Sequence, residues 1–140
     1  MKSPLPSWML VVALAATCIF CACETDRFDI TGDWEIIMAM DGSGMGYDRS
    51  RASLWTLTGD QTEGEVSADV SFLSGTYQVR GRSITMEIVS GRGPMWFRRH
   101  FRGVVTGDGA MQGRYAGESI PLGPEDPETF AGTWWAIKKQ

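Results

Sequence analysis

Beyond residue 23 the chain contains no cysteine, so disulfide bonds play no part in that portion. The three cysteines, Cys18, Cys21 and Cys23, stand in or directly after an apolar N-terminal segment. Exported proteins are free to use disulfides, which makes their absence from the rest of the chain informative. The cysteines are better explained by processing of a leader than by pairing.

Histidine is almost absent as well, since His100 is the only one in 140 residues. The sequence has no Gly-x-Ser-x-Gly elbow and no His-Glu-x-x-His helix, the motifs that would mark a hydrolase or a zinc protease. His100 shares its face of an expected strand with Trp96, Arg98 and Arg102, which we predict to be the outer face. We therefore expect a protein that is not an enzyme and that needs no cofactor and no metal.

Long hydrophobic runs are limited to one, Trp8 to Phe20, which follows the positive charge of Lys2. It is shorter than the ~20 apolar residues of a membrane-spanning helix and suits the hydrophobic core of a secretory leader. An uncleaved N-terminal membrane helix is the alternative. Asparagine is absent and arginine outnumbers lysine ten to three, a bias that indicates a GC-rich bacterial genome.

The end of this leader, Phe20-Cys21-Ala22-Cys23, resembles the lipobox of bacterial lipoproteins. It matches the motif at Ala22 and Cys23 and departs from it at Phe20 and Cys21. The resemblance implies a signal peptide over 1–22, cleavage before Cys23 and diacylglycerol on its thiol.

A lipidated Cys23 would leave a short tether over 23–31 and a folded domain over 32–140. Ala15 to Cys18 is a weaker second match to the lipobox. We expect labelling by palmitate and a location in the bacterial cell envelope, on the outer membrane facing the periplasm, because Glu24 replaces the Asp that retains enterobacterial lipoproteins in the inner membrane.

Period-two alternation dominates the remainder, and no segment shows a sustained helical period. The clearest strand runs from Glu65 to Phe72, with Val66, Ala68, Val70 and Phe72 on one face. The expected strands are 33–40, 52–59, 64–72, 75–80, 83–90, 95–106, 110–117 and 132–139. The fold class is therefore all-β, and an eight-stranded antiparallel up-and-down barrel would remove both sheet edges. A two-sheet sandwich fits the same pattern.

Gly32-Asp33-Trp34 resembles the Gly-x-Trp signature of the calycin superfamily, which includes lipocalins and avidins. In that superfamily the Trp plugs one end of the barrel and a basic residue of the last strand packs over it. The resemblance implies these parts for Trp34 and for Lys138 or Lys139. We predict that Trp34 and Trp135 are both buried, with the first strand paired to the last.

The predicted interior is rich in methionine and aromatic side chains, which adapt to irregular apolar ligands and also simply fill cores. It consists of Trp34, Met38, Met40, Trp55, Phe72, Tyr77, Met86, Met95, Phe97, Phe101, Tyr115 and Trp135. Candidate ligand-binding residues are Arg99, Phe97, Phe101, Met38, Met86 and Tyr77.

Strict alternation places Arg99 on the apolar face between Phe97 and Phe101, where a guanidinium is costly without a partner. Three explanations remain open. A β-bulge near Arg98 and Arg99 would turn Arg99 outward. Alternatively, Arg99 lies at the barrel mouth with its head in water, or it points inward to meet an anionic ligand.

The expected function is that of a lipid-anchored, periplasm-facing barrel that binds a small apolar or amphipathic ligand. The alternative is a structural or interaction lipoprotein with a filled core, whose partner is another envelope protein. Basic and aromatic residues mix between Arg92 and Arg102, but export and a net charge of −4 argue against nucleic acid as a partner.

Overall fold

The structure is a computed structural model that describes residues 28–42, 51–68, 72–107 and 109–140. The described residues form an all-β domain, as predicted, and all eight expected strands are present. The strands are β1 (Gly32–Met40), β2 (Ser53–Gly59), β3 (Glu63–Ala68), β4 (Phe72–Arg80), β5 (Ser83–Arg92), β6 (Met95–Gly107), β7 (Ala110–Pro121) and β8 (Thr129–Lys138).

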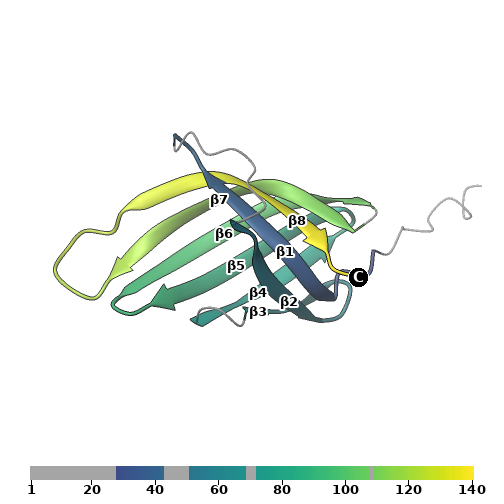
Figure 1. Ribbon diagram of the computed structural model, residues 1–140, viewed down its shortest axis with the longest axis horizontal. Helices are drawn as coiled ribbons and strands as arrows, with labels where there is room; N and C mark the ends of the chain where they lie inside the picture. Colours follow the sequence, from purple (N-terminus) through teal and green to yellow (C-terminus); the bar gives the residue numbers. More distant parts are fainter. Residues whose placement is uncertain (1–27, 43–50, 69–71, 108) are drawn as a thin grey trace, which may run out of the picture.

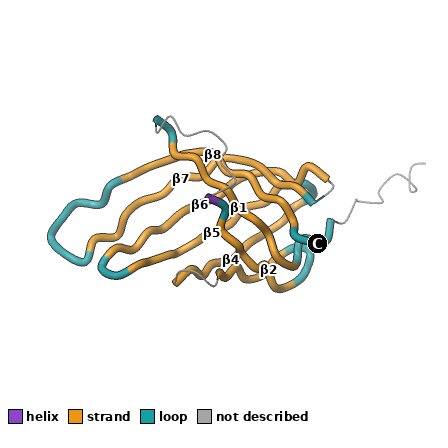
Figure 2. Tube along the Cα trace, in the orientation of Figure 1, coloured by secondary structure: helices purple, strands orange, loops and turns teal. Residues whose placement is uncertain are grey.

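The strands close into a barrel in which each pairs antiparallel with its neighbours in sequence (Figures 1 and 2). The β1 strand pairs on one side with β2, where Trp34 stands opposite Trp55, and on the other with β8, where Trp34 stands opposite Lys138. The predicted closure of the first strand on the last is confirmed, and the sandwich alternative is wrong. Closure gives every strand a partner on both sides, which limits the sheet edges open to other chains.

The two ends of the barrel differ. The turns β2–β3, β4–β5 and β6–β7 share one end with residues 28–31 and the C-terminus, and we call it the closed end. At the other end, the mouth, β5 to β8 have 10, 13, 12 and 10 residues, whereas β2 and β3 have only 7 and 6. The long strands therefore project past the short ones as a lip (Figure 1).

Tight glycine turns join the long strands at the closed end. Gly81, in the β4–β5 turn, has φ of 59°, and Gly107 and Gly109 flank the β6–β7 turn with φ of 81° and 73°. These values lie in the left-handed region that residues with a Cβ rarely adopt. Both turns connect adjacent antiparallel strands of the barrel.

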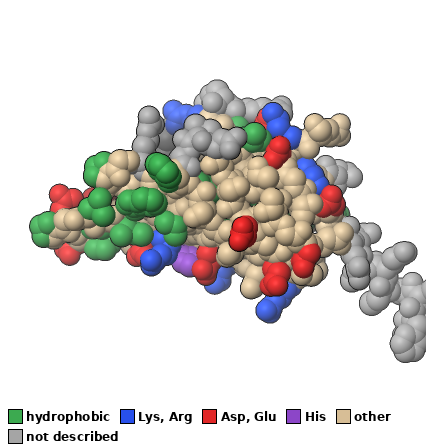
Figure 3. All heavy atoms as spheres, turned by 90° about the horizontal axis from the view of Figure 1, so that it is seen from below, with side chains coloured by type: hydrophobic (Ala, Val, Ile, Leu, Met, Phe, Trp, Pro, Cys, Tyr) green, Lys and Arg blue, Asp and Glu red, His purple; other side chains and the backbone are tan. Residues whose placement is uncertain are grey.

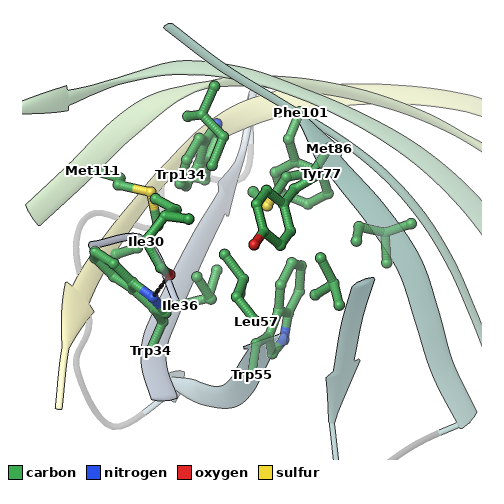
Figure 4. Packing of buried hydrophobic residues seen from close by; sticks show 14 of the residues in the cluster. Ile30, Trp34, Ile36, Trp55, Leu57, Tyr77, Met86, Phe101, Met111 and Trp134 are labelled. Atoms are coloured by element: carbon green, nitrogen blue, oxygen red, sulfur yellow. Dashed lines mark hydrogen bonds between the residues drawn. The ribbon is translucent and has the colours of Figure 1, made fainter. Parts of the chain in front are cut away.

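Aromatic side chains fill the middle of the barrel (Figure 4). Phe101 stacks on Tyr115 with ring centroids 5.5 Å apart and meets Trp55 and Trp134 edge-on at 5.4 and 5.7 Å. The largest fully buried side chains are Trp34, Trp55, Trp134, Tyr77, Phe101, Ile30, Ile36, Leu57, Ile84, Met86, Ile88 and Met111. The core cluster lies between Ile30 and Ala136, so a chain that begins at Glu24 carries all of it.

Glycines on neighbouring strands make room for these rings. A Cβ on Gly103 would lie 2.6 Å from the Trp134 indole, and one on Gly132 would lie 2.7 Å from the Tyr115 ring. The Tyr77 ring likewise lies close to Gly64, where an added Cβ would come within 2.7 Å of it. The strand glycines therefore serve close packing of large rings, the role expected where a side chain approaches a backbone.

Four predicted interior residues lie elsewhere. Phe72 is 79% exposed, because β3 ends at Ala68 and Phe72 opens β4 in the outward phase. Met40 and Met95 have the inward phase but stand at strand ends by the mouth, where they are 49% and 54% exposed. The orientation that alternation predicts for these two methionines is correct, but both lie beyond the filled core. Val70, also predicted inward, lies outside the described residues.

The fourth correction concerns the tryptophan pair of β8. Trp134 is fully buried and points inward, whereas Trp135 stands opposite Ile37 on the outer face and is only partly buried. The prediction that Trp135 points into the barrel is therefore wrong by one residue, which in a strand reverses the face. The predicted burial of Trp34, with 1% exposure, is confirmed.

Candidate ligand site at the barrel mouth

Trp34 seals the closed end of the barrel. Its indole N–H donates a hydrogen bond to the carbonyl oxygen of Ile30 at 2.9 Å, and the Nζ of Lys138 lies 5.9 Å from the ring centroid. Lys138 also donates to the carbonyl oxygen of Asp29 at 2.7 Å and pairs with its carboxylate at 3.3 Å. Of the two lysines considered from the sequence, Lys138 therefore lies over Trp34, whereas Lys139 pairs with Glu35 at 3.1 Å.

The Asp29 carboxylate is fixed by these contacts. Hydrogen bonds from the hydroxyl of Thr31 and from Lys138 lower the pKa of Asp29, with smaller contributions from the Thr31 backbone N–H and the charge of Lys138. The chain that leads into β1 is thus held at the closed end, far from the mouth along β1.

At the mouth, Arg99 has the inward phase that alternation predicts. It stands opposite Ile88 on β5 and Gly117 on β7, and the ladder is regular on both sides from Met95 to Val105. The single irregularity of the β6–β7 ladder lies between Val105 and Gly107. The explanation that a bulge turns Arg99 outward is therefore wrong.

The Arg99 guanidinium sits between two phenyl rings. Its central carbon lies 5.0 Å from the ring centroid of Phe97 and 5.4 Å from that of Phe130, and one NH1 hydrogen bond of 2.7 Å reaches the hydroxyl of Ser90. Phe97 and Phe130 meet edge-on, 6.0 Å apart. The rings and the hydroxyl fix the direction of the guanidinium and hold its stem in place.

The charge of Arg99 has no balancing carboxylate in the part of the chain that the structure describes. Among the described residues no Asp or Glu forms an ion pair with it. Burial lowers the pKa of Arg99, and the interaction with Tyr115 opposes this; burial likewise raises the pKa of Tyr115, while Arg99 lowers it. A guanidinium nevertheless remains protonated at neutral pH, so the mouth holds one half-buried positive charge.

The walls around this charge are apolar and partly open. One lateral row of the inner face crosses β4 to β7, and each of its residues stands opposite the next. The row consists of Leu73, Ser90, Phe97 and Ser119. Leu73, Phe97 and Phe130 are partly buried, whereas Phe101 and Tyr115, further in, are buried. The mouth therefore combines a half-buried cation with partly exposed rings above the filled core.

The predicted ligand-binding residues divide into two groups. Arg99 and Phe97 meet at the mouth, whereas Phe101, Met86 and Tyr77 belong to the filled core with 1% exposure each. Tyr77 points toward the closed end, where its hydroxyl donates to the carbonyl oxygen of Asp60 at 2.6 Å. Met38 is partly buried on β1.

Sequence reasoning missed Ser90 and Phe130. Ser90 continues the inward phase of Ile84, Met86 and Ile88, and a polar residue at the end of such a series is a detectable signal. Phe130 precedes the expected start of the last strand, so it had no predicted face.

The outer face of β6 is basic, as predicted. Arg98 pairs with Glu118 at 3.1 Å, and His100 is exposed and lies 3.5 Å from Glu87. Arg102 is exposed as well. The side chain of Arg92, like the glycine-rich loop around Gly44, lies outside the described residues.

The described ranges contain no group of three or more His, Cys, Asp or Glu residues able to hold a metal ion. No helix there has the length and apolar character needed to cross a bilayer. The predicted leader and Cys23 lie outside these ranges.

Comparison with known proteins leaves the fold as the best guide. No protein-family model matches the chain, and neither the curated proteins nor the solved structures contain a significant match. The fold and the plugged end define a class, the small closed up-and-down barrels with eight strands. That architecture is consistent with a calycin-like domain.

Proposed function

We propose that the protein is a lipid-anchored envelope barrel that binds an amphipathic molecule with an anionic head group at its mouth. The observation that carries the proposal is Arg99, a half-buried guanidinium between two phenyl rings with no carboxylate partner among the described residues. Eight-stranded barrels are wide enough to hold one small ligand.

The geometry supports a short apolar contact rather than a deep cavity. Trp134, Phe101 and Tyr115 fill the space below the mouth, so an acyl chain would lie along the partly open side chains of the lip. Phe97 and Phe130 offer it ring edges while Arg99 pairs with the head group. Charge-assisted hydrogen bonds from a guanidinium to a carboxylate or phosphate suit such recognition.

The proposed anchor fits this arrangement. Phe28 and Asp29 lie at the closed end, where Arg82 stacks on the Phe28 ring at 5.3 Å. If Cys23 carries lipid, a few residues separate the bilayer from that end, and the mouth faces away from the membrane. The proposed site would then open to the periplasm.

Replacing Arg99 with Met should weaken binding of oleate by about tenfold or more, because a charge-assisted hydrogen bond is worth roughly 1.5–3 kcal/mol. Binding of oleyl alcohol, which has the same chain without the charge, should not change. Isothermal titration calorimetry on the chain from Glu24 onwards measures both.

Arg98→Met is the matched control, since Arg98 is adjacent in sequence but exposed on the outer face. Equal losses in the two variants would reduce the effect to net charge. Absence of oleate binding in the wild type would instead favour an interaction lipoprotein with a filled core.

The anchor has its own test. Replacing Cys23 with Ala should abolish incorporation of labelled palmitate and leave an uncleaved or mislocalised precursor, because the thiol that would accept the diacylglycerol is removed. Undiminished labelling would assign the lipid to Cys18 or refute the anchor. Cys21→Ala, two residues away, is the control that should label normally.

A further inference from the structure

A groove of about 730 Å³ lies at the tip of the lip, beyond the Arg99 site, whose inner row it meets at Ser119. The β5–β6 turn, the end of β7 and the β7–β8 loop form it. Its lining includes Trp96, Ile120, Leu122, Glu125, Asp126 and Glu128. Figure 3 shows hydrophobic side chains gathered at this end of the molecule, with acidic ones beside them.

The apolar part of this surface is exposed. Trp96 lies against Gly91, where an added Cβ would come within 2.5 Å of its ring, and it stands opposite Ile120 on β7. Beside it Met95 is 54% exposed and Leu122 71%.

The same outer row extends sideways to β4, because Phe72, 79% exposed, stands opposite Gly91. Large side chains this exposed and this close together mark an interaction surface.

The polar part of the groove is acidic. Glu125, Asp126 and Glu128 are exposed, and within the described chain none of them pairs with a Lys or Arg. The basic residue of the neighbouring row, Arg98, is already paired with Glu118. The lining itself contains no basic residue, so an apolar floor adjoins three carboxylates that have no basic partner among the described residues.

The geometry points to a docking site for a basic, amphipathic segment of another protein chain. Its apolar side chains would cover Trp96, Ile120 and Leu122, and its lysines or arginines would meet the carboxylates of the loop. Complementary charge selects partners and speeds association. The carboxylates equally disfavour the anionic surface of a bilayer, and the chain enters the barrel at the opposite, closed end. This inference does not depend on ligand binding at Arg99.

A fluorescein-labelled peptide of alternating lysine and leucine tests the inference by fluorescence anisotropy on the chain from Glu24 onwards. The double variant Glu125→Gln/Asp126→Asn should weaken its binding about fivefold at low salt, since each exposed charge pair adds up to about 1 kcal/mol. Leu122→Ser should weaken it by a similar factor without affecting the fold, because Leu122 lies outside the core.

The control is Glu63→Gln/Glu65→Gln, which removes the same charge from exposed positions of β3. It should change the affinity less than about twofold. Equal losses in the two double variants would show attraction by net charge alone and overturn the site. So would equal binding of an alternating glutamate–leucine peptide, an unchanged affinity in Leu122→Ser, or binding to phosphatidylcholine vesicles in place of the peptide.

Discussion

Replacing Trp134 with Ala is expected to lower the free energy of unfolding by about 3–5 kcal/mol, the usual range for removing a buried Trp. The indole is fully buried, its ring centroid lies 5.7 Å from that of Phe101, and it occupies the space that Gly103 leaves open. Neighbouring strands cannot collapse into that volume, because their backbones are fixed by the β6–β7 and β7–β8 ladders. The loss is a large part of the 5–15 kcal/mol that stabilises a typical domain.

Urea denaturation followed by far-ultraviolet circular dichroism measures this loss. Trp135→Ala is the matched control, one residue along the same strand but on the outer face and only partly buried. It should cost less than half as much. A larger loss for Trp135 than for Trp134 would mean that β8 has the opposite face inward.

Replacing Trp34 with Ala is the second large effect, and we again expect a loss of about 3–5 kcal/mol. The substitution removes the plug of the closed end, the hydrogen bond to the Ile30 carbonyl and the surface over which Lys138 lies. Trp34→Phe should recover most of the packing but not the hydrogen bond, which is worth about 1 kcal/mol.

Lys138→Met measures the contribution of Lys138 separately from that of Trp34. It removes a cation–π contact and the contacts with Asp29 but keeps the apolar stem, so we expect a loss of about 1 kcal/mol. If Trp34→Ala were as mild as Lys138→Met, Trp34 would not be the residue that closes the barrel.

The sequence is a good guide to this fold where alternation is strict. In β5 only one phase is apolar, and Ile84, Met86 and Ile88 are buried as that phase predicts. In β8 both phases are apolar, since Trp134 and Ala136 alternate with Trp135 and Ile137. Periodicity alone cannot choose between them, and the choice of Trp135 was wrong.

The site was predictable in part. Strict alternation placed Arg99 on the inner face, and the regular β5–β6 ladder confirms it. Two features of the site were not visible in the sequence. The first is that the barrel is filled below the mouth, because rings such as Trp134 occupy the space beside glycines such as Gly103. Phe101, Met86 and Tyr77 therefore belong to the core. The second is the contact of Phe130 with Arg99, which depends on the pairing of β7 with β8.

The most direct test of the central claim is the ionisation of a bound ligand. Palmitate labelled with carbon-13 at its carboxyl group can be titrated with pH by NMR in the presence of the wild-type protein, Arg99→Met and Arg98→Met. A nearby guanidinium favours the charged form of a carboxylate and lowers its pKa. We expect a bound carboxyl resonance whose pKa is lowered in the wild type and in Arg98→Met but not in Arg99→Met. A bound resonance with the same pKa in all three proteins, or no bound resonance at all, would contradict it.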